Sequence, residues 1–463
     1  MAEIDRNKGI GLSSTDYVAD FVATTKLEDV PSEAIDIGKN ALIDFMGITV
    51  LGSKAPAGKI LCEYIKDVGA KAESTVICQG IKTSAELAAL VNAVMSHADD
   101  YGDTLPISAK YNLHPSGAIL SALLALAEKK RLSGKELLGA YAIGMEVMYR
   151  IGQVIGSRIS QAGWHPTPIL GTIGAVSASA RALKLSSHQV KMALGISGSL
   201  AGGISRNNRT MVKGMHVGNA ARNGVISATI AEYGFIGSDN VFEGKNGFCQ
   251  VFSGQTEGLV NAVKDLGSRW QLLKTGLGFK PYPACRSMHA SIDGSLYLKE
   301  KFNVDVTKIS TITIKTSPFT KRLDHDRPRN GYEAKFSPEF CIAIALLFGR
   351  VSLEHFTDEW IKDPRVQQLM SNTTMTHPDG WVESLVEHKT EIIVRLENGE
   401  EHSHLVILPK GEPENPVTVE VLTNKFMDNC SSILGEEKGI KIVDLTKKLD
   451  EMNDLDELFR LLK

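Results

Sequence analysis

Apolar residues recur every three to four positions along most of the first 270 residues, which is the spacing of core-facing helices. The segment TSAELAALVNAVMSHA, which begins at Thr83, places Leu90, Val91 and Val94 on one helical face. Glu86 stands three positions after Thr83, and this Thr-x-x-Glu pattern is typical of a capping box. We therefore predict a helix that begins at Thr83.

Two further helix starts follow. Pro115 suits a first helical turn, where its missing N–H costs nothing, and Ser133 with Glu136 forms a second capping-box pattern. Residues 163–203 are rich in Gly, Ala and Ser but lack the G-x-G-x-x-G order of a phosphate-binding loop. We interpret these small residues as allowing helices to pack closely.

The pattern changes after about residue 270. Residues Ile309 to Thr316, ISTITIKT, alternate with period two, as a half-buried strand does. Asn398-Gly399 lies between two more strand-like runs and fits a type I′ hairpin turn. The segments SPEFCIAIALLFGR and DPRVQQLMS between these strands are predicted helices, and the chain becomes helical again after PKGEPENP.

The predicted fold is therefore mainly α with an α+β second domain. We expect an all-helical domain over residues 1–268, an α+β lid domain over 269–408, and C-terminal helices over 409–463 that return to the helical domain.

Composition narrows the function classes. The 463 residues carry a net charge of -3 without a basic run, which argues against nucleic acid and anionic membranes as partners. The six cysteines are scattered, with no C-x-x-C spacing, which argues against a zinc site or a disulfide framework. The polar N-terminus and the lack of a long uncharged apolar run predict a cytoplasmic protein with no membrane span.

Five stretches place titratable or cationic residues beside helix-breaking prolines or glycines. These residues are Asp100, Asp103, Thr104 and His114 in the first stretch, His165 in GWHPTP, Lys213 and His216 in MVKGMHVGNAARNG, Lys280, Tyr282, Arg286 and His289 in FKPYPACRSMHASID, and Lys335 and Ser337 in NGYEAKFSPEF.

Three of the candidates, His114, His165 and Lys280, directly precede a proline. The residue before a proline avoids helical dihedrals, so each is expected at an element boundary where an anionic ligand is favoured.

Such a set suits proton transfer beside a carboxylate. A histidine is the usual base near neutral pH, and Lys213, Lys280 or Arg286 would stabilise negative charge, with Asp100 orienting a base or a lysine. This chemistry requires no metal. Structural roles are open for others: Asp103 with Thr104 as a loop cap, and His97 as an imidazolium at a helix C-terminus.

These stretches resemble the MmgE/PrpD family, which includes 2-methylcitrate dehydratases, cis-aconitate decarboxylases and iminodisuccinate epimerases. The matching elements follow in family order: H-x-x-D-Y-x-D-T from His97, HPSGAILSALLALAE, GWHPTPILGTIGA, MVKGMHVGNAARNG, FKPYPACRSMHASIDG and GEPENPVTVEVLTNKF. The resemblance implies a homodimer with the active site between a helical domain and a lid domain, and no cofactor.

Carried over to this chain, the family's site residues are Asp100, Thr104, His114, His165, Lys213 and Lys280. The resemblance implies that His165 or His114 transfers the proton and that Lys213 and Lys280 hold substrate carboxylates. We add His216, Tyr282 and Arg286 as predicted substrate-binding residues.

The sequence departs from parts of the family at three points. HPSGA replaces the HPSDN of methylcitrate dehydratases, Gly102 stands where many members have an acid, and Phe340 stands where some decarboxylase-like members have a tyrosine. The leading hypothesis is a cofactor-free lyase, of dehydratase or decarboxylase type, acting on a small di- or tricarboxylate. An epimerase of a small dicarboxylate such as iminodisuccinate and a non-catalytic carboxylate-binding protein are the alternatives.

Overall fold

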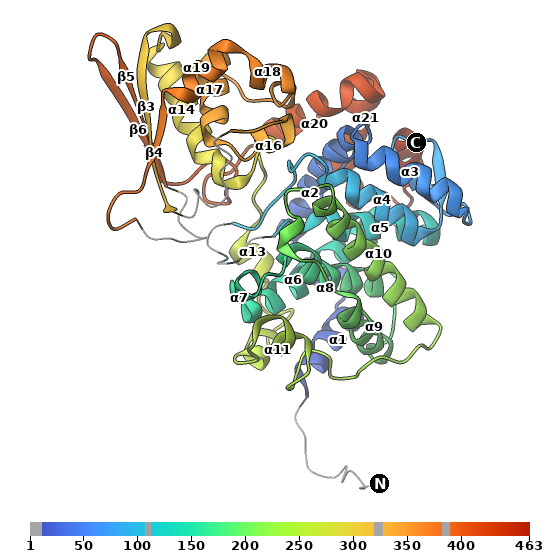
Figure 1. The fold of residues 1–463 in the computed structure, drawn as a ribbon. Helices are drawn as coiled ribbons and strands as arrows, with labels where there is room; N and C mark the ends of the chain where they lie inside the picture. The colour runs from blue at the N-terminus through green and yellow to red at the C-terminus, as the bar shows by residue number, and fades with distance from the viewer. Residues whose placement is uncertain (1–11, 107–108, 110, 112, 319–326, 382–388) are drawn as a thin grey trace.

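The computed structural model describes residues 12–106, 109, 111, 113–318, 327–381 and 389–463 (Figure 1). Among the described helices, none is long and apolar enough to cross a membrane. The helices that form the large domain are α1 (Ser14–Thr24), α2 (Ser32–Gly52), α3 (Pro56–Val68), α4 (Ala85–His97), α5 (Ser116–Lys130), α6 (Gly134–Ile155), α7 (Arg158–Gln161), α8 (Pro166–Ala182), α9 (Ser187–Leu200), α10 (Val212–Glu232), α11 (Phe248–Ser253), α12 (Leu259–Val263) and α13 (Gln271–Thr275).

The centre of the large domain is built from helices that pack at very short range. Helix α8 packs against α6, α5 and α10, and α10 packs against α4. A Cβ atom added at Gly144 of α6 would lie 2.7 Å from the carbonyl oxygen of Gly174 in α8. One added at Gly224 of α10 would lie 2.6 Å from Ala175 Cβ. The interpretation of the small residues in 163–203 as helix-packing positions is therefore confirmed.

The C-terminal helices α20 (Val419–Leu434), α21 (Glu436–Lys447) and α22 (Asp456–Leu462) lie against the large domain (Figure 1). Helix α20 packs on α2, and one hydrophobic core contains residues from Val18 to Phe279 and again from Leu422 to Leu462. The second core begins at Tyr282 and ends at Val394. We keep the boundaries near 268 and 408 as proposed domain limits.

The smaller domain is an α+β layer. Its helices are α14 (His289–Phe302), α16 (Gly331–Ala334), α17 (Pro338–Phe348), α18 (Asp358–Lys362) and α19 (Pro364–Ser371), and its strands are β3 (Ile309–Thr316), β4 (Thr373–Thr376), β5 (Thr390–Leu396) and β6 (Glu401–Val406).

These strands form one sheet in the order β4-β3-β5-β6, with β3 and β4 parallel and the other pairs antiparallel. Ile312 pairs with Val394 on one side and Thr373 on the other. Figure 1 shows α14, α17 and α19 gathered beside the sheet, and the buried Ile312 and Ile314 share a core with α17. The predicted strand over 309–316 and the predicted helices of this region are confirmed.

Two local predictions were wrong. A short hairpin of β1 (Ser74–Val76) and β2 (Ile81–Thr83) pairs Ser74 with Thr83, so Thr83 ends a strand and Ser84 is the N-cap of α4. The Asn398-Gly399 turn is not type I′, because only Gly399 has a positive φ, of 86°. The Leu396 N–H instead donates to the Glu400 carbonyl and so closes a three-residue loop. Gly399 occupies the left-handed position of this loop.

The second capping box was predicted correctly. Ser133 is the N-cap of α6; its hydroxyl accepts from the Glu136 N–H at 3.2 Å, and its own N–H donates to the Glu136 carboxylate at 2.9 Å. Pro115 is the N-cap of α5, one residue before the first helical position.

Candidate active site

Asp100 is the centre of a buried cluster of charges at the loop after α4. Lys213, in the first turn of α10, donates to Asp100 Oδ1 at 2.8 Å. Lys280 donates to the same oxygen at 3.1 Å and to the Asp100 carbonyl at 2.7 Å. Asp100 has a φ of 52°, a left-handed conformation that aspartate adopts more readily than most residues and that often marks functional sites. Three segments more than 60 residues apart in the chain thus meet at one carboxylate.

The three charges support each other despite their burial. Burial alone would raise the pKa of Asp100, but Lys213 and Lys280 hold that pKa well below its usual value. Burial opposes the charge of Lys213, but Asp100 outweighs it and raises the pKa of Lys213. Burial lowers the pKa of Lys280, and the charge of Lys213 lowers it further. The opposing charge of Asp100 offsets only part of this decrease. With one carboxylate and two ammonium groups, the cluster carries a net positive charge and favours an anion.

Four imidazoles surround this cluster. His114 Nδ1 lies 2.7 Å from the Asp103 carbonyl, so Nδ1 carries the proton and Nε2 faces Asp100 Oδ1 at 3.7 Å. The rings of His97 and His114 lie 5.0 Å apart, and His165 Nδ1 lies 3.0 Å from His216 Nδ1. Because a neutral ring has one donor nitrogen, one of this last pair donates and the other accepts.

The imidazoles are neutral in the ligand-free chain. Burial lowers the pKa of His97 and His165 well below 6.5, and the charge of Lys213 lowers both further. Burial and Lys280 do the same for the pKa of His114. A bound carboxylate would oppose these effects and raise each pKa, so substrate binding and proton uptake are coupled at this site.

His165 lies at an element boundary, as expected for a residue that precedes a proline. It is the N-cap of α8, with extended backbone dihedrals, and its N–H donates to the Gly203 carbonyl at 2.9 Å. Gly203 has a φ of 143°, and a Cβ there would lie 3.2 Å from the His216 ring and 2.7 Å from Pro168. The absent side chain at 203 therefore leaves room for the His165–His216 pair.

Thr104 connects two segments of the site. Its backbone and that of Gly278 exchange two hydrogen bonds of 2.9 Å, which fixes the Asp100 loop beside the strand-like segment that leads to Lys280. Its buried hydroxyl donates to the Leu105 carbonyl at 3.2 Å. A substrate-binding role for Thr104 remains a prediction.

Tyr282 and Arg286 make their contacts elsewhere. The Tyr282 hydroxyl donates to Asp293 at 2.6 Å, and Arg286 pairs with the buried Glu412. Both side chains therefore hold together parts of the smaller domain and the segment after it. The structure does not bring them to the Asp100 cluster.

Asp103 acts as a cap. Its carboxylate accepts from the Ser116 N–H at 3.2 Å, at the first position of α5, and also from the Ser116 hydroxyl. Burial raises the pKa of Asp103 to about 7, against the effect of these bonds.

Lys425 is a residue of this region that sequence reasoning missed. Its ammonium donates to Asp44 at 2.6 Å, to the Tyr101 carbonyl at 2.7 Å and to the Lys280 carbonyl at 2.9 Å. It thus fixes the backbone next to Asp100 and at Lys280. The available signal was its position on α20, one residue before the buried Phe426 and three after the buried Leu422, where an apolar residue is expected.

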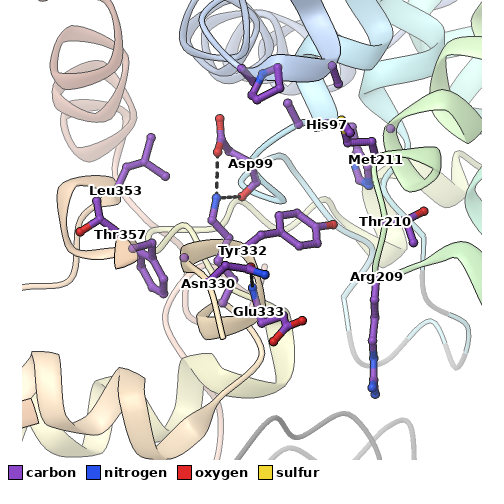
Figure 2. Close-up of a pocket in the computed structure, with 18 of the residues that line it drawn as sticks. His97, Asp99, Arg209, Thr210, Met211, Asn330, Tyr332, Glu333, Leu353 and Thr357 are labelled. Atoms are coloured by element: carbon purple, nitrogen blue, oxygen red, sulfur yellow. Dashed lines mark hydrogen bonds and ion pairs between the residues drawn. The ribbon is translucent and has the colours of Figure 1, made fainter. Parts of the chain in front are cut away.

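A cavity of about 650 Å³ lies between the two domains next to the cluster. Its walls include His97, Asp99 and Met211 from the large domain, and Tyr332 and Phe356 from the smaller one. Figure 2 shows Tyr332 extending from the smaller domain toward the segment that carries Thr210 and Met211.

An ion pair joins the two walls. The Lys335 ammonium donates to Asp99 Oδ1 at 2.8 Å and to the Asp99 carbonyl at 2.9 Å (Figure 2). Asp100 and Lys213 lie behind the wall and are not part of the cavity lining, whereas His97 belongs to both the lining and the cluster.

The Gly102 and Phe340 departures have physical explanations. The Cβ of a side chain at 102 would lie 3.0 Å from Ile48 Cδ1, so an acid there would require Ile48 to shift. Phe340 is fully buried in the core of the smaller domain, 5.6 Å from the Phe356 ring. A hydroxyl is instead present at Tyr332. Burial raises the pKa of Tyr332 to about 12 against the opposing charge of Lys213, so it is a neutral donor close to that ammonium.

The cluster fits a metal poorly. Ligand atoms of His97, Asp100 and His114 lie within 4.8 Å of one another, a grouping that the sequence did not reveal. However, Asp100 Oδ1 already accepts hydrogen bonds from the Lys213 and Lys280 ammonium groups. Two positive charges at the same oxygen oppose a bound cation and favour a carboxylate.

Comparison with known proteins gives the class of this chain. The MmgE/PrpD N-terminal domain model matches residues 16–258, and the MmgE/PrpD C-terminal domain model matches residues 282–450. The chain therefore belongs to the MmgE/PrpD family and is an enzyme of the lyase type. The resemblance in the sequence motifs is confirmed.

Individual relatives align over nearly the whole chain. The cis-aconitate decarboxylase of Homo sapiens is 28% identical over 97% of this chain and 95% of its own length. A cis-aconitate decarboxylase-like protein of Aspergillus oryzae is 27% identical over 97% of both chains. The cis-aconitate decarboxylase of Aspergillus terreus is 24% identical over 99% of this chain and 97% of its own.

Proposed function

We propose that this protein is a decarboxylase of cis-aconitate or a closely related unsaturated tricarboxylate, and that it needs no cofactor. The observation that supports this most strongly is the cluster of Asp100, Lys213 and Lys280 surrounded by neutral imidazoles beside an interdomain cavity. The similarity to cis-aconitate decarboxylases favours this reaction over the others of the family.

Lys213 is the proposed carboxylate-binding group. Within the described residues its ammonium makes a single hydrogen bond, to Asp100, so two N–H groups remain for substrate oxygens. Lys280 is less available, because its ammonium makes two bonds to Asp100. A carboxylate that reaches Lys213 would complete its hydrogen bonding and balance the positive charge of the cluster.

The proposed reaction breaks one C–C bond and forms one C–H bond. One carboxylate leaves as carbon dioxide. The electron pair of the broken C–C bond is then delocalised over the adjacent double bond as an allylic carbanion. A proton then joins the far allylic carbon, next to a carboxylate, so the trianion takes up one proton and gives a dianion and carbon dioxide. Lys213 and Lys280 stabilise the negative charge on the way.

The proton would come from an imidazole of the cluster. His165 and His114 are the donors that the sequence suggests, with His216 holding His165 through the bond between their Nδ1 atoms. Although these rings are neutral in the ligand-free chain, the negative charge of the substrate would raise their pKa values and load the proton.

The apolar side of the cavity suits the leaving group. Ala57, Val94 and Met211 are among the residues that line it. A carboxylate placed against such a wall lacks hydrogen-bond donors, while neutral carbon dioxide is not penalised there.

We also propose that the protein is a cytoplasmic homodimer. In support of self-association, Tyr233, Phe235 and Ile236 follow α10 and are 80%, 59% and 80% exposed. Light scattering tests this, and a monomer at micromolar concentration would contradict it.

The function is tested by mixing the purified, metal-free protein with cis-aconitate and measuring carbon dioxide release. Release at a rate proportional to enzyme supports the proposal. Exchange of a substrate C–H for deuterium without carbon dioxide would support an epimerase. Binding without either would identify a carboxylate-binding protein.

A further inference from the structure

His97 is a buried histidine whose side chain has no hydrogen-bond partner among the described residues. It is the last residue of α4 and is 5% exposed. Its Nε2 is fully buried and unpaired, and no hydrogen bond to its side chain occurs within the part of the chain that the structure describes. A buried imidazole without a partner carries a desolvation cost, so native proteins rarely keep one without a use for it.

The structural role suggested by the sequence does not explain His97. A histidine at a helix C-terminus stabilises the helix dipole only when it is charged. Burial and the charge of Lys213 instead lower the pKa of His97 well below its ordinary value, so the ring is neutral.

The position of His97 differs from that of the other imidazoles. The His114 ring is hydrogen-bonded to the Asp103 carbonyl, and the His165 ring is hydrogen-bonded to the His216 ring. His97 lines the interdomain cavity (Figure 2). Its ring also lies 5.0 Å from the ring of His114. A ligand in the cavity therefore meets His97 before it reaches Asp100.

We propose that His97 is a catalytic residue that contacts the bound substrate and delivers the proton which the allylic carbon gains. This rests on the proposed decarboxylation, and it assigns the proton to a third imidazole rather than to His165 or His114. The imidazolium N–H bond breaks as the C–H bond forms, carbon dioxide leaves with the former carboxylate carbon, and solvent restores the proton to the ring.

The charged and titratable groups around His97 determine whether its ring is protonated. Lys213, Lys280 and His114 disfavour the imidazolium and Asp100 favours it, while His165 lies close enough to be affected by His97 in turn. Tyr332 and Lys335 line the cavity from the smaller domain, and Lys335 is paired with Asp99 on the same wall as His97. A substrate carboxylate adds negative charge to this group and shifts the balance toward the imidazolium.

The first test compares His97→Gln with His188→Gln, a control at an exposed histidine on α9. We expect His97→Gln to lower kcat for carbon dioxide release by about 10²–10⁴-fold and to remove the pH dependence of kcat near neutrality. Binding of tricarballylate, a saturated tricarboxylate that cannot undergo the allylic reaction, should weaken far less than kcat falls. The control should match the wild type.

Three results would overturn the proposal. One is a His97→Gln enzyme with a wild-type kcat and pH profile. A second is a kcat loss that vanishes once the folded fraction is counted, since a structural residue would behave in this way. The third is wild-type activity that rises with added zinc or manganese and depends on His97, which would make His97 a metal ligand.

A crystal structure of the wild-type protein with tricarballylate decides the matter if the variant does not fold. The proposal requires the ligand to lie within about 3 Å of a His97 nitrogen. A ligand seated away from His97 contradicts it. If cis-aconitate is not turned over but tricarballylate still binds His97, the proposed function fails while the substrate contact stands.

Discussion

Two buried aspartates, Asp44 and Asp100, each bind lysine ammonium groups in the same hydrogen-bonded region, and they differ in how fully those lysines are used. The Lys425 ammonium beside Asp44 donates three hydrogen bonds, one to Asp44 and two to backbone carbonyls. Lys213 beside Asp100 makes a single hydrogen bond within the described residues, and the nearby His97 ring makes none there. A saturated buried charge holds the fold in place, whereas an unsaturated one beside a cavity is prepared for a ligand.

The largest expected effect is on activity when the unsaturated lysine is removed. Lys213→Met should lower kcat/KM for cis-aconitate by about 10²–10³-fold, because it removes an ammonium that stabilises the developing negative charge. Steady-state kinetics measure this, and circular dichroism checks that the fold is retained. Lys425→Met should lower kcat/KM by less than tenfold. Equal losses in the two variants would remove the distinction between the two lysines.

The saturated lysine should instead control stability. Lys425→Met leaves the Asp44 carboxyl buried without its partner and should reduce the free energy of unfolding by about 3–5 kcal/mol. Urea denaturation monitored by tryptophan fluorescence measures the change.

The double variant Asp44→Leu with Lys425→Met is the matched control. It removes both charges and should recover most of the lost stability. A double variant that is no more stable than Lys425→Met would show that the bonds to the Tyr101 and Lys280 carbonyls, rather than the ion pair, carry the effect.

The pH dependence should report the neutral imidazoles of the site. Because the pKa values of His97, His114 and His165 lie well below 6.5 in the free enzyme, an acid that must be protonated becomes scarcer as pH rises. We therefore expect kcat/KM to fall by up to tenfold per pH unit above neutrality. Since bound substrate raises these pKa values, kcat should fall only at higher pH. If kcat/KM fell only at the high pH where lysines titrate, a lysine would be the acid.

The smallest predicted effect concerns the hydroxyl on the cavity wall. Tyr332→Phe should raise KM by about three- to tenfold, the usual worth of one hydrogen bond, with little change in stability. The reason is that Tyr332 lines the cavity (Figure 2) and interacts electrostatically with the Lys213 ammonium. A KM equal to that of the wild type would place this hydroxyl outside the substrate site.

Local patterns predicted much of the fold. The alternation over 309–316 identified β3, and the Ser133–Glu136 pair identified the start of α6, because both signals depend on neighbouring residues only. The predicted helix start at Thr83 was wrong because Thr83 pairs with Ser74 in another strand. Pairing between strands outweighs a local capping pattern.

The site was predictable only in part. The residues before prolines identified His165 and Lys280, since a proline restricts the residue that precedes it. Lys425 and Tyr332 were missed, because contacts such as Lys425–Asp44 join positions 381 residues apart. Burial, which decides that His97 is neutral and unpaired, is likewise a property of the packed chain rather than of any short segment.

The most direct test of the proposed decarboxylation is proton NMR of the metal-free protein with cis-aconitate in D₂O, run beside the Lys213→Met variant. We expect new signals of a terminal methylene group, one deuterium at the carbon next to a carboxylate in each product molecule, and almost no product from the variant. Wild-type protein that leaves cis-aconitate unchanged, or a Lys213→Met variant that is as active as the wild type, would contradict it.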